Sequence, residues 1–180
     1  VPGCSTGEEV YSLAICLQEY LEENALNRTC QIFGTDLCAR YVEKARRAWY
    51  ADQIRKQVSA ERLERFFEPA GEGWVVTKII RERCIFAVQD MVQDPPFPNL
   101  DLVSCRNVLI YFDTALQDRA VPLFHFALNQ GGFLVLGSSE TMSRHAALFT
   151  LVDRKGNIYR KCTAGSRPDY PFPTFPTGSR

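Results

Sequence analysis

Gly3-Cys4-Ser5-Thr6-Gly7-Glu8-Glu9 is a run of small residues that ends in two glutamates and leads directly into a helical pattern. Small residues ahead of a helix let a ligand reach the backbone, because few side chains intervene and the first helical N–H groups lack partners. Phosphate-binding loops normally offer lysine or bare amides, whereas two carboxylates in the first turn repel an anion and attract a cation. The loop therefore predicts a ligand that carries positive charge.

A further acidic residue, Asp36, follows the short apolar run Gln31–Thr35. In a nucleotide-binding α/β unit, an acidic residue at such a place binds the ribose hydroxyls. A nucleoside with a cationic tail satisfies both observations, and S-adenosylmethionine is the common example. Taken alone, the loop also fits a simpler interpretation, because acidic residues favour the first turn of any helix.

The composition predicts one soluble domain with a substantial core. The chain has 180 residues, of which 46% are hydrophobic. Lys plus Arg equal Asp plus Glu at 21 each, so no global field attracts nucleic acid or an anionic membrane. The seven scattered cysteines predict free thiols and a cytoplasmic protein. His125 and His145 lie far apart in the sequence, so we expect no metal site.

Hydrophobic periodicity predicts alternating helices and strands. The expected helices cover residues 8–23, 39–49 and 114–126, and the expected strands cover residues 32–35, 85–88, 100–104 and 133–136, with a hairpin over 149–152 and 158–160. We expect the last helix to begin at a capping box of Thr114 and Gln117 and to be closed by Gly131-Gly132. The alternation predicts a doubly wound α/β fold with helices on both faces of a mostly parallel sheet and an antiparallel C-terminal hairpin.

The rhythm changes between about residues 50 and 83, which predicts a small β-subdomain inserted into a domain of residues 1–162. Ser59 is expected to cap a short helix, and Gly71–Gly73 to form a tight turn. Residues 163–180, with four of the ten prolines, indicate an extended tail or linker. Val1–Gly3 leaves no room for the strand that normally precedes a nucleotide loop. We therefore expect a segment of a longer polypeptide whose first core strand is missing.

Four motifs in this order resemble those of the CheR-type chemotaxis receptor methyltransferases. They are Gly3–Glu9 followed by Tyr11-Ser12, then Gly34-Thr35-Asp36, then Asp101–Asp113 and finally Gly131–Glu140. The resemblance covers residues 3 to about 161, and the segment Cys105–Phe112 is its most specific part. The stretches Ser59–Phe67 and Asp94–Phe97 are most similar to the variant in multidomain signalling proteins that fuse methylesterase-like and methyltransferase-like domains.

The resemblance implies a Rossmann-like methyltransferase fold with S-adenosylmethionine as cofactor and S-adenosylhomocysteine as product. Glu9 would hold the cofactor's amino group, Asp36 the ribose hydroxyls, and Asp90 with Met91 the adenine edge. Asp90 replaces the Asn usual in simpler members. The full set of expected cofactor contacts is Gly3, Ser5, Thr6, Glu9, Asp36, Asp90, Met91, Cys105 and Arg106, the last two beside the methionine portion.

The implied reaction needs little acid–base chemistry. The acceptor would be a chemoreceptor glutamate, whose unperturbed pKa of about 4.3 leaves it ionised at neutral pH, so no general base is required. Catalysis would come from alignment of the reacting atoms with water removed. Arg106 is expected to hold either the acceptor carboxylate or the cofactor's own carboxylate, and Tyr111 to fix the acceptor oxygen by its hydroxyl. In the structural alternative, Arg106 and Asn107 cap the strand end and Tyr111 is a core aromatic.

Two other functions compete with the enzyme. The main alternative is a non-catalytic module that keeps the cofactor pocket as a sensor or the fold as an interaction surface; the joint presence of Glu9, Asp36, Arg106 and Tyr111 favours the enzyme. Methylation of a small molecule is disfavoured, because the insert resembles a subdomain that in some family members grips a receptor peptide by adding a strand. The helical domain that precedes the catalytic domain in full enzymes has no counterpart in this sequence.

Overall fold

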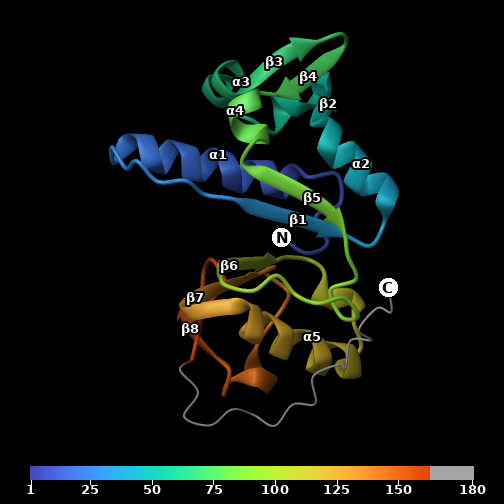
Figure 1. Cartoon of the computed structure of the whole chain (residues 1–180), viewed down its shortest axis with the longest axis vertical. Helices are drawn as coiled ribbons and strands as arrows, with labels where there is room; N and C mark the ends of the chain where they lie inside the picture. The colour runs from blue at the N-terminus through green and yellow to red at the C-terminus, as the bar shows by residue number, and fades with distance from the viewer. Residues whose placement is uncertain (163–180) are drawn as a thin grey trace, which may run out of the picture. The chain divides into compact units, whose positions relative to one another are not determined.

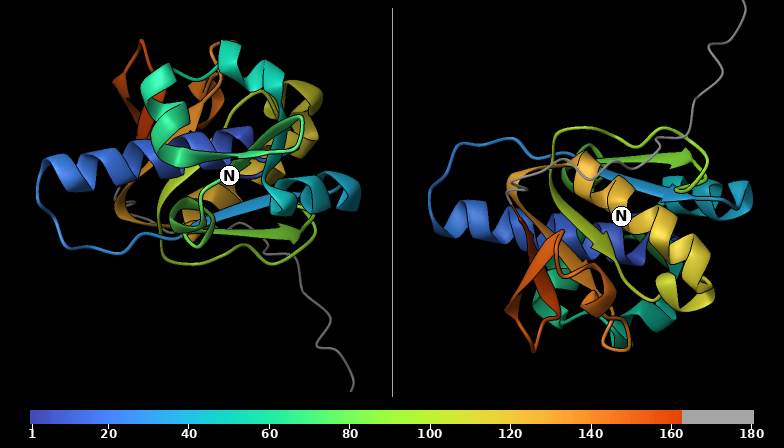
Figure 2. Two further views of the ribbon diagram at one scale, coloured as in Figure 1. Left: turned by 90° about the horizontal axis from the view of Figure 1, so that it is seen from above. Right: turned by 90° about the horizontal axis from the view of Figure 1, so that it is seen from below.

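The computed structural model describes residues 1–162, and the predicted tail of residues 163–180 lies outside them. The chain forms two compact units: the first contains Val1 and Gly3–Gln89, and the second contains Pro2 and the chain from Asp90 (Figures 1 and 2). Each unit has a pair of parallel strands joined through a helical connection, and each has its own hydrophobic core. The predicted α/β class, with parallel and antiparallel strands, is confirmed.

The first unit packs helices on a parallel strand pair. Its main elements are α1 (Glu8–Glu23), β1 (Ile32–Asp36), α2 (Ala39–Arg47) and β5 (Cys84–Val88). β1 and β5 pair from Ile32↔Cys84 to Asp36↔Val88. Gly34 permits close packing, because a Cβ there would lie 2.7 Å from the Phe86 ring and 2.8 Å from Val10. The predicted helix over residues 39–49 ends early, because Ala48 adopts a left-handed conformation with φ 53°.

The predicted β-subdomain is a three-stranded antiparallel sheet in the order β2-β4-β3, seen at the top of Figure 1. Its elements are β2 (Trp49–Ala51), the 3-10 helix η1 (Asp52–Lys56), α3 (Ala60–Phe66), β3 (Phe67–Ala70), β4 (Gly73–Val76) and α4 (Lys78–Arg81). Ser59 caps α3 as predicted, since its Oγ accepts a hydrogen bond from the N–H of Arg62 at 3.3 Å. Gly71, with φ 61°, makes the predicted turn between β3 and β4.

The second unit contains a four-stranded sheet in the order β6-β7-β9-β8. Its elements are β6 (Leu100–Cys105), η2 (Leu109–Tyr111), α5 (Thr114–Ala127), β7 (Leu128–Leu136), η3 (Ser143–His145), β8 (Phe149–Asp153) and β9 (Ile158–Lys161). β6 and β7 are parallel, and the other two pairs are antiparallel. The predicted antiparallel C-terminal hairpin is therefore confirmed.

The predicted ends of α5 are both wrong. The N-cap is Asp113, whose carboxylate accepts a hydrogen bond from the N–H of Leu116 at 2.8 Å, while the side chain of Gln117 bonds elsewhere. At the other end the chain passes from Ala127 directly into β7. Gly131-Gly132 consequently lies inside this strand, where its pairing with β6 shifts register, and does not cap the helix.

All seven cysteines are free thiols. Burial raises the pKa of the Cys4 thiol to about 11 and that of Cys84 to about 12, so neither is a thiolate at neutral pH. Within residues 1–162, no helix is long and apolar enough to cross a bilayer. The same residues hold no group of three or more side chains suited to bind a metal ion.

Candidate functional site

The residues ahead of the loop Gly3–Gly7 run alongside β1. The Val1 ammonium donates to the Phe33 carbonyl at 2.7 Å, and the N–H of Thr35 donates to the Val1 carbonyl at 2.9 Å. The N–H of Cys4 in turn donates to the Thr35 carbonyl at 2.9 Å. These bonds follow the slanted pattern of parallel strands and bring the loop to the C-terminal end of β1. A missing first core strand stays a prediction.

Three residues of the loop have positive φ: Gly3 at 66°, Ser5 at 49° and Gly7 at 92°. Glycine adopts this conformation freely, whereas for Ser5 it is uncommon and requires support. Packing also fixes Gly7, because a Cβ there would lie 2.9 Å from the Cβ of Ala45. Gly3 and Ser5 are exposed, so backbone atoms of the loop are open to a ligand.

Asp36, at the end of β1, supplies the support for Ser5. Its Oδ2 accepts a hydrogen bond from the N–H of Ser5 at 2.9 Å, and its Oδ1 accepts one from the N–H of Cys38 at 2.9 Å. The residue is half-buried. Each carboxylate oxygen can accept a second bond, so Asp36 retains the capacity to bind a pair of neighbouring hydroxyls. Two sequence-predicted site residues, Ser5 and Asp36, are thus brought together.

The two glutamates in the first turn of α1 differ in role. Glu8 is exposed, and its two carboxylate oxygens accept from the Thr6 hydroxyl at 2.6 and 2.8 Å. The Thr6 carbonyl accepts from the Tyr50 hydroxyl at 3.0 Å. Thr6 is therefore held on both its side chain and its backbone. Glu9 is half-buried and is the carboxylate that the family resemblance assigns to the ligand.

Asp90 begins the second unit and closes a turn of its own. Its Oδ1 accepts from the N–H groups of Val92 and Gln93 at 2.9 and 3.1 Å, and its Oδ2 accepts from the Gln93 side chain at 2.8 Å. Asp94 returns the contact by accepting from the N–H of Asp90 at 2.8 Å. This local role was missed from the sequence. Met91, the neighbouring predicted contact, is half-buried against the core of the second unit.

The chain turns out of the core directly after β6. Cys105, the last residue of β6, is 0% exposed and packs in the core of the second unit. Arg106 is exposed, and within residues 1–162 its guanidinium has neither a hydrogen bond nor an ion pair. Tyr111 is 80% exposed. The structural alternative for Tyr111, a core aromatic, is therefore wrong.

Glu140, the last residue of the motif Gly131–Glu140, makes contacts that the sequence analysis did not predict. It is 8% exposed, and its carboxylate accepts hydrogen bonds from four backbone N–H groups, those of Gly137, Asn107, Val108 and Ile110. The last three belong to the segment between Arg106 and Tyr111. The available signal was a lone glutamate at the end of a run of apolar and small residues, where a charge must find buried partners.

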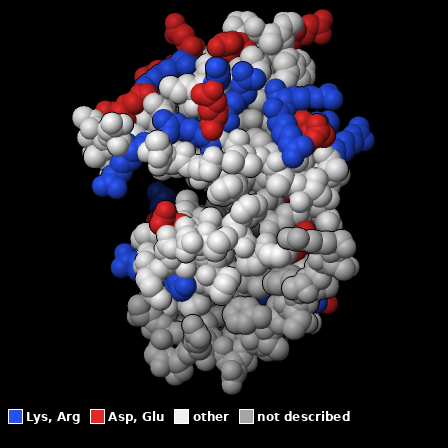
Figure 3. Space-filling model, in the orientation of Figure 1, with Lys and Arg blue, Asp and Glu red and all other residues white. Residues whose placement is uncertain are grey.

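Charge is concentrated locally although the chain as a whole is neutral. Lys and Arg side chains gather over α2 in Figure 3, and the residues are Arg40, Lys44, Arg46 and Arg47. Arg46 is occupied by the Phe86 carbonyl, to which it donates at 2.7 and 3.2 Å, and by Glu43 at 2.6 Å. The other three side chains are exposed, which leaves a basic helix face available to an acidic partner.

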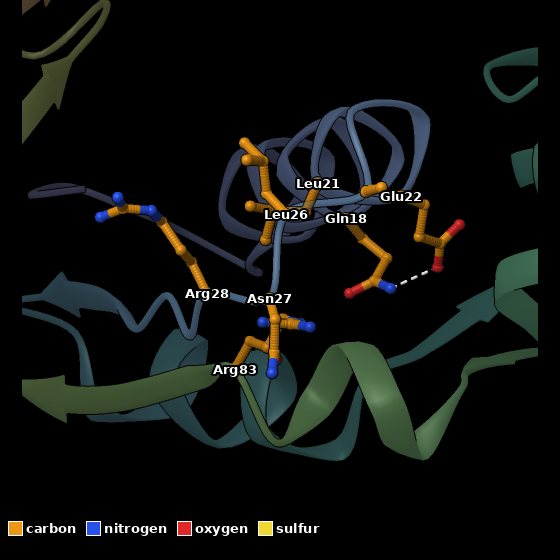
Figure 4. A pocket seen from close by; sticks show the side chains of 8 residues that line it. Gln18, Leu21, Glu22, Leu26, Asn27, Arg28 and Arg83 are labelled. Atoms are coloured by element: carbon orange, nitrogen blue, oxygen red, sulfur yellow. Dashed lines mark hydrogen bonds between the residues drawn. The ribbon is translucent and has the colours of Figure 1, made fainter.

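A pocket of about 340 Å³ lies at the opposite end of α1 from Glu9 (Figure 4). Its lining is Gln18, Leu21, Glu22, Ala25, Leu26, Asn27, Arg28 and Arg83. On the α1 side of the pocket, the Gln18 amide donates a hydrogen bond to the Glu22 carboxylate. At 1.5 Å per residue, the helix separates Glu22 from Glu9 by about 20 Å. This pocket is therefore not part of the candidate site.

Comparison with known proteins finds one family over nearly all of the described chain. Residues 2–158 match the family described as "CheR methyltransferase, SAM binding domain". An uncharacterized 104.1 kDa protein from the hypE 3′ region of Rhodobacter capsulatus is 36% identical over 166 residues, which are 92% of this chain and 17% of that protein.

Two Pseudomonas proteins give similar matches. Cher3 of Pseudomonas putida is 39% identical over 171 residues, which cover 89% of this chain and 61% of that protein. Chemotaxis protein methyltransferase 1 of Pseudomonas aeruginosa is 34% identical over 163 residues, which cover 87% of this chain and 60% of that protein. The chain thus spans less than two thirds of the length of each of these relatives. It belongs to the CheR methyltransferase family and matches the S-adenosylmethionine-binding domain of that family.

Proposed function

We propose that this chain is the catalytic domain of a protein-glutamate O-methyltransferase that methyl-esterifies glutamate side chains of chemoreceptors or related signalling proteins in the cytoplasm. The proposal rests on the hydrogen bond from the Ser5 N–H to the Asp36 carboxylate, which fixes the exposed loop to the end of β1 in a chain of the CheR family. The exposed loop backbone and the acidic side chain thus lie together at the end of a parallel strand, where α/β folds bind nucleosides.

The residues of the first unit fit the cofactor. S-Adenosylmethionine supplies, when bound, a methyl group activated by its positive sulfonium. Asp36 would accept from the ribose hydroxyls with the lone pairs that Ser5 and Cys38 leave free. Glu9 would pair with the amino group, and the exposed backbone of Gly3 and Ser5, with that of Thr6, would line the methionine portion. A cationic ligand also relieves the repulsion between neighbouring carboxylates in the first turn of α1.

We assign the adenine contacts to Asp90 and Met91. The Asp90 carboxylate already accepts three hydrogen bonds within its own turn, so its contact with the adenine amino group would use the capacity that remains on Oδ2. Cys105 directly precedes Arg106 in the sequence and is buried in the core. It would therefore act through its packing.

Arg106 and Tyr111 are assigned to the acceptor glutamate. Both side chains are exposed, and neither is required for the core. The guanidinium would hold a carboxylate by charge-assisted hydrogen bonds, and the Tyr111 hydroxyl would donate to the acceptor oxygen that does not attack. The acceptor is already ionised at neutral pH, so the work of these residues is orientation and not proton removal. The basic face of α2 gives an acidic substrate segment a further place to contact the first unit.

Methyl transfer to a receptor fragment tests the proposal. The protein at its natural full length is incubated with methyl-labelled S-adenosylmethionine and a helical receptor fragment that carries glutamates, and label is counted as base-labile methyl ester. Wild type and the control Tyr20→Phe, which alters an exposed tyrosine of α1, should label the fragment, whereas Arg106→Ala should not. Cofactor binding by wild type without any labelling would favour the sensor.

A further inference from the structure

We propose that Glu140 is a positioning residue, whose carboxylate holds the turn Asn107–Ile110 so that Arg106 and Tyr111, at its two ends, are presented to the substrate. The inference rests on the proposed function for what those two residues do. It concerns a residue to which neither composition nor motif spacing assigned a role. All the contacts that carry it lie within the second unit.

The carboxylate of Glu140 is surrounded by backbone donors. Its Oε2 accepts from the N–H groups of Gly137 at 2.7 Å and Asn107 at 3.1 Å, and its Oε1 accepts from those of Val108 at 3.0 Å and Ile110 at 3.3 Å. Within residues 1–162 it forms no ion pair with Lys, Arg or His. A buried charge is thus compensated by the turn itself, and the turn has its N–H groups satisfied by that charge.

Two features fit the close contact between this turn and Glu140. Asn107 has φ 58°, in the left-handed region that asparagine tolerates better than most residues other than glycine. A Cβ at Gly137 would lie 2.9 Å from the backbone nitrogen of Asn107 and 2.9 Å from Oε2 of Glu140, so only glycine lets the two segments approach this closely. Residues on both sides therefore suit this contact: Asn107 in the turn and Gly137 in the segment that carries Glu140.

Side chains on either side complete the support. Asn157 donates to the carbonyls of Gly137 and Glu140 at 2.7 and 2.9 Å, which fixes the backbone that carries the carboxylate. Gln117 donates to the carbonyls of Leu109 and Phe112 at 3.0 and 3.1 Å. Glu140 thus binds the N–H groups of the turn, while Gln117 binds carbonyls on its far side.

The end residues have little else to fix them. Arg106 has no hydrogen-bonding partner within the described chain, and Tyr111 is 80% exposed. Their positions are therefore set by the backbone between them. Because displacement by about 1 Å can slow an aligned reaction about 100-fold, loosening this turn should affect the chemical step more than the binding of cofactor.

The test compares Glu140→Gln with Asp153→Asn. The amide keeps the size of Glu140 but turns an NH2 group toward backbone donors. Asp153 is a matched control, because its carboxylate also caps a turn of the second unit, accepting from the N–H groups of Lys155 and Gly156 at 3.0 and 3.2 Å. The measurements are hydrogen exchange of the amides of residues 107–110, the Kd for S-adenosylhomocysteine, and kcat and KM for labelling of a receptor fragment, all in the full-length protein.

For Glu140→Gln we expect exchange of residues 107–110 to become at least about 10-fold faster and kcat to fall about 100-fold. Kd and KM should stay within about threefold, because Glu140 itself touches neither ligand and the loosened turn still carries Arg106. Asp153→Asn should leave kcat and this exchange unchanged. Unchanged exchange in Glu140→Gln would overturn the inference, as would faster exchange with a wild-type kcat.

If Glu140→Gln does not fold, Glu140→Asp replaces it: the charge is kept, the reach is shorter by one methylene, and an intermediate loss of kcat is expected, whereas a wild-type kcat would overturn the inference. If wild type itself transfers no methyl group, the proposed function fails. Hydrogen exchange then still decides, independently of activity, whether Glu140 holds the turn.

Discussion

The loop Gly3–Gly7 and the turn Asn107–Ile110 are both held by a carboxylate that accepts backbone N–H groups, but the two carboxylates are placed differently. Asp36 is half-buried and accepts one hydrogen bond from the loop, at Ser5. Glu140 is 8% exposed and accepts three from the turn and a fourth from Gly137. Asp36 keeps lone pairs open to a ligand, whereas Glu140 is enclosed.

The two units therefore differ in whether the residue that supports the backbone is also assigned to bind a ligand. In the first unit one side chain supports the loop and is also assigned to the cofactor, so loop order and ligand binding should change together. In the second unit the support is Glu140, and the assigned chemistry belongs to the exposed Arg106 and Tyr111. Changes to the chemistry should therefore leave the turn intact.

Asp36→Ala should give the largest effect. It removes the acceptor of Ser5 and the acceptor assigned to the ribose, so the affinity for S-adenosylhomocysteine should fall about 100-fold, about 3 kcal/mol. Asp36→Asn, which keeps one acceptor oxygen, should lose less. Calorimetry gives both affinities, and hydrogen exchange at Ser5 should rise in parallel with the loss. Unchanged affinity in Asp36→Ala would remove this residue from the cofactor site.

Tyr111→Phe should show the opposite pattern. The loss of one positioning hydrogen bond should cost about 1–3 kcal/mol of transition-state stabilisation, roughly 5- to 150-fold in kcat. The affinity for cofactor and the exchange of residues 107–110 should not change, because Tyr111 supports neither. Tyr20→Phe serves as the control in the same labelling assay. If Tyr111→Phe and Tyr20→Phe have equal kcat values, Tyr111 has no part in the mechanism.

Gly34→Ala tests whether the first loop depends on the packing beneath it. The added methyl group would overlap the Phe86 ring and Val10, and overpacking of this kind typically lowers the free energy of unfolding by about 1–3 kcal/mol. Gly71→Ala isolates backbone strain from packing, because its turn has open space around it but a φ of 61° that a residue with a side chain rarely adopts. Thermal unfolding measures both. A stability equal to wild type in Gly34→Ala would show that α1 and β1 are not closely packed.

The smallest expected effect is on pH dependence, and it should be confined to the second unit. Burial lowers the pKa of His125 and of His145, and neither histidine lies in the first unit. The unfolded chain therefore binds more protons, and their contribution to stability is full above an unfolded pKa of about 6.5 and is lost as the pH falls below it. Hydrogen-exchange protection, corrected for intrinsic rates, should decrease in α5 and β7 between pH 7.5 and 5.5. Replacement of both histidines by Asn should weaken that decrease.

Local sequence patterns predicted most of the elements but not their ends. The periodicity of residues 8–23 and the apolar run before Asp36 gave α1 and β1, because amphipathic spacing is set by residues close in the chain. The N-cap of α5 was misplaced by one residue, since Asp113 and Thr114 are both good caps. Gly131-Gly132 looks like a helix terminator in sequence but lies at an irregularity in β7, which depends on the pairing with β6.

The candidate site was predictable where one residue carries the signal. Asp36 and the loop stood out by residue type and position, whereas their direct bond through Ser5 could only come from the fold. Glu140 was not identified, because its partners lie about 30 residues earlier and are backbone N–H groups, which leave no trace in side-chain type. The local partners of Asp90 were missed for the same reason.

The most direct test of the central claim is methyl transfer by the full-length protein to a receptor fragment, followed as base-labile methyl ester on glutamate. We expect wild type to label the fragment, and labelling to disappear when the acceptor glutamates are replaced by alanine. Binding of S-adenosylmethionine by wild type without label on any glutamate would contradict the claim and would leave the chain as a cofactor-binding module.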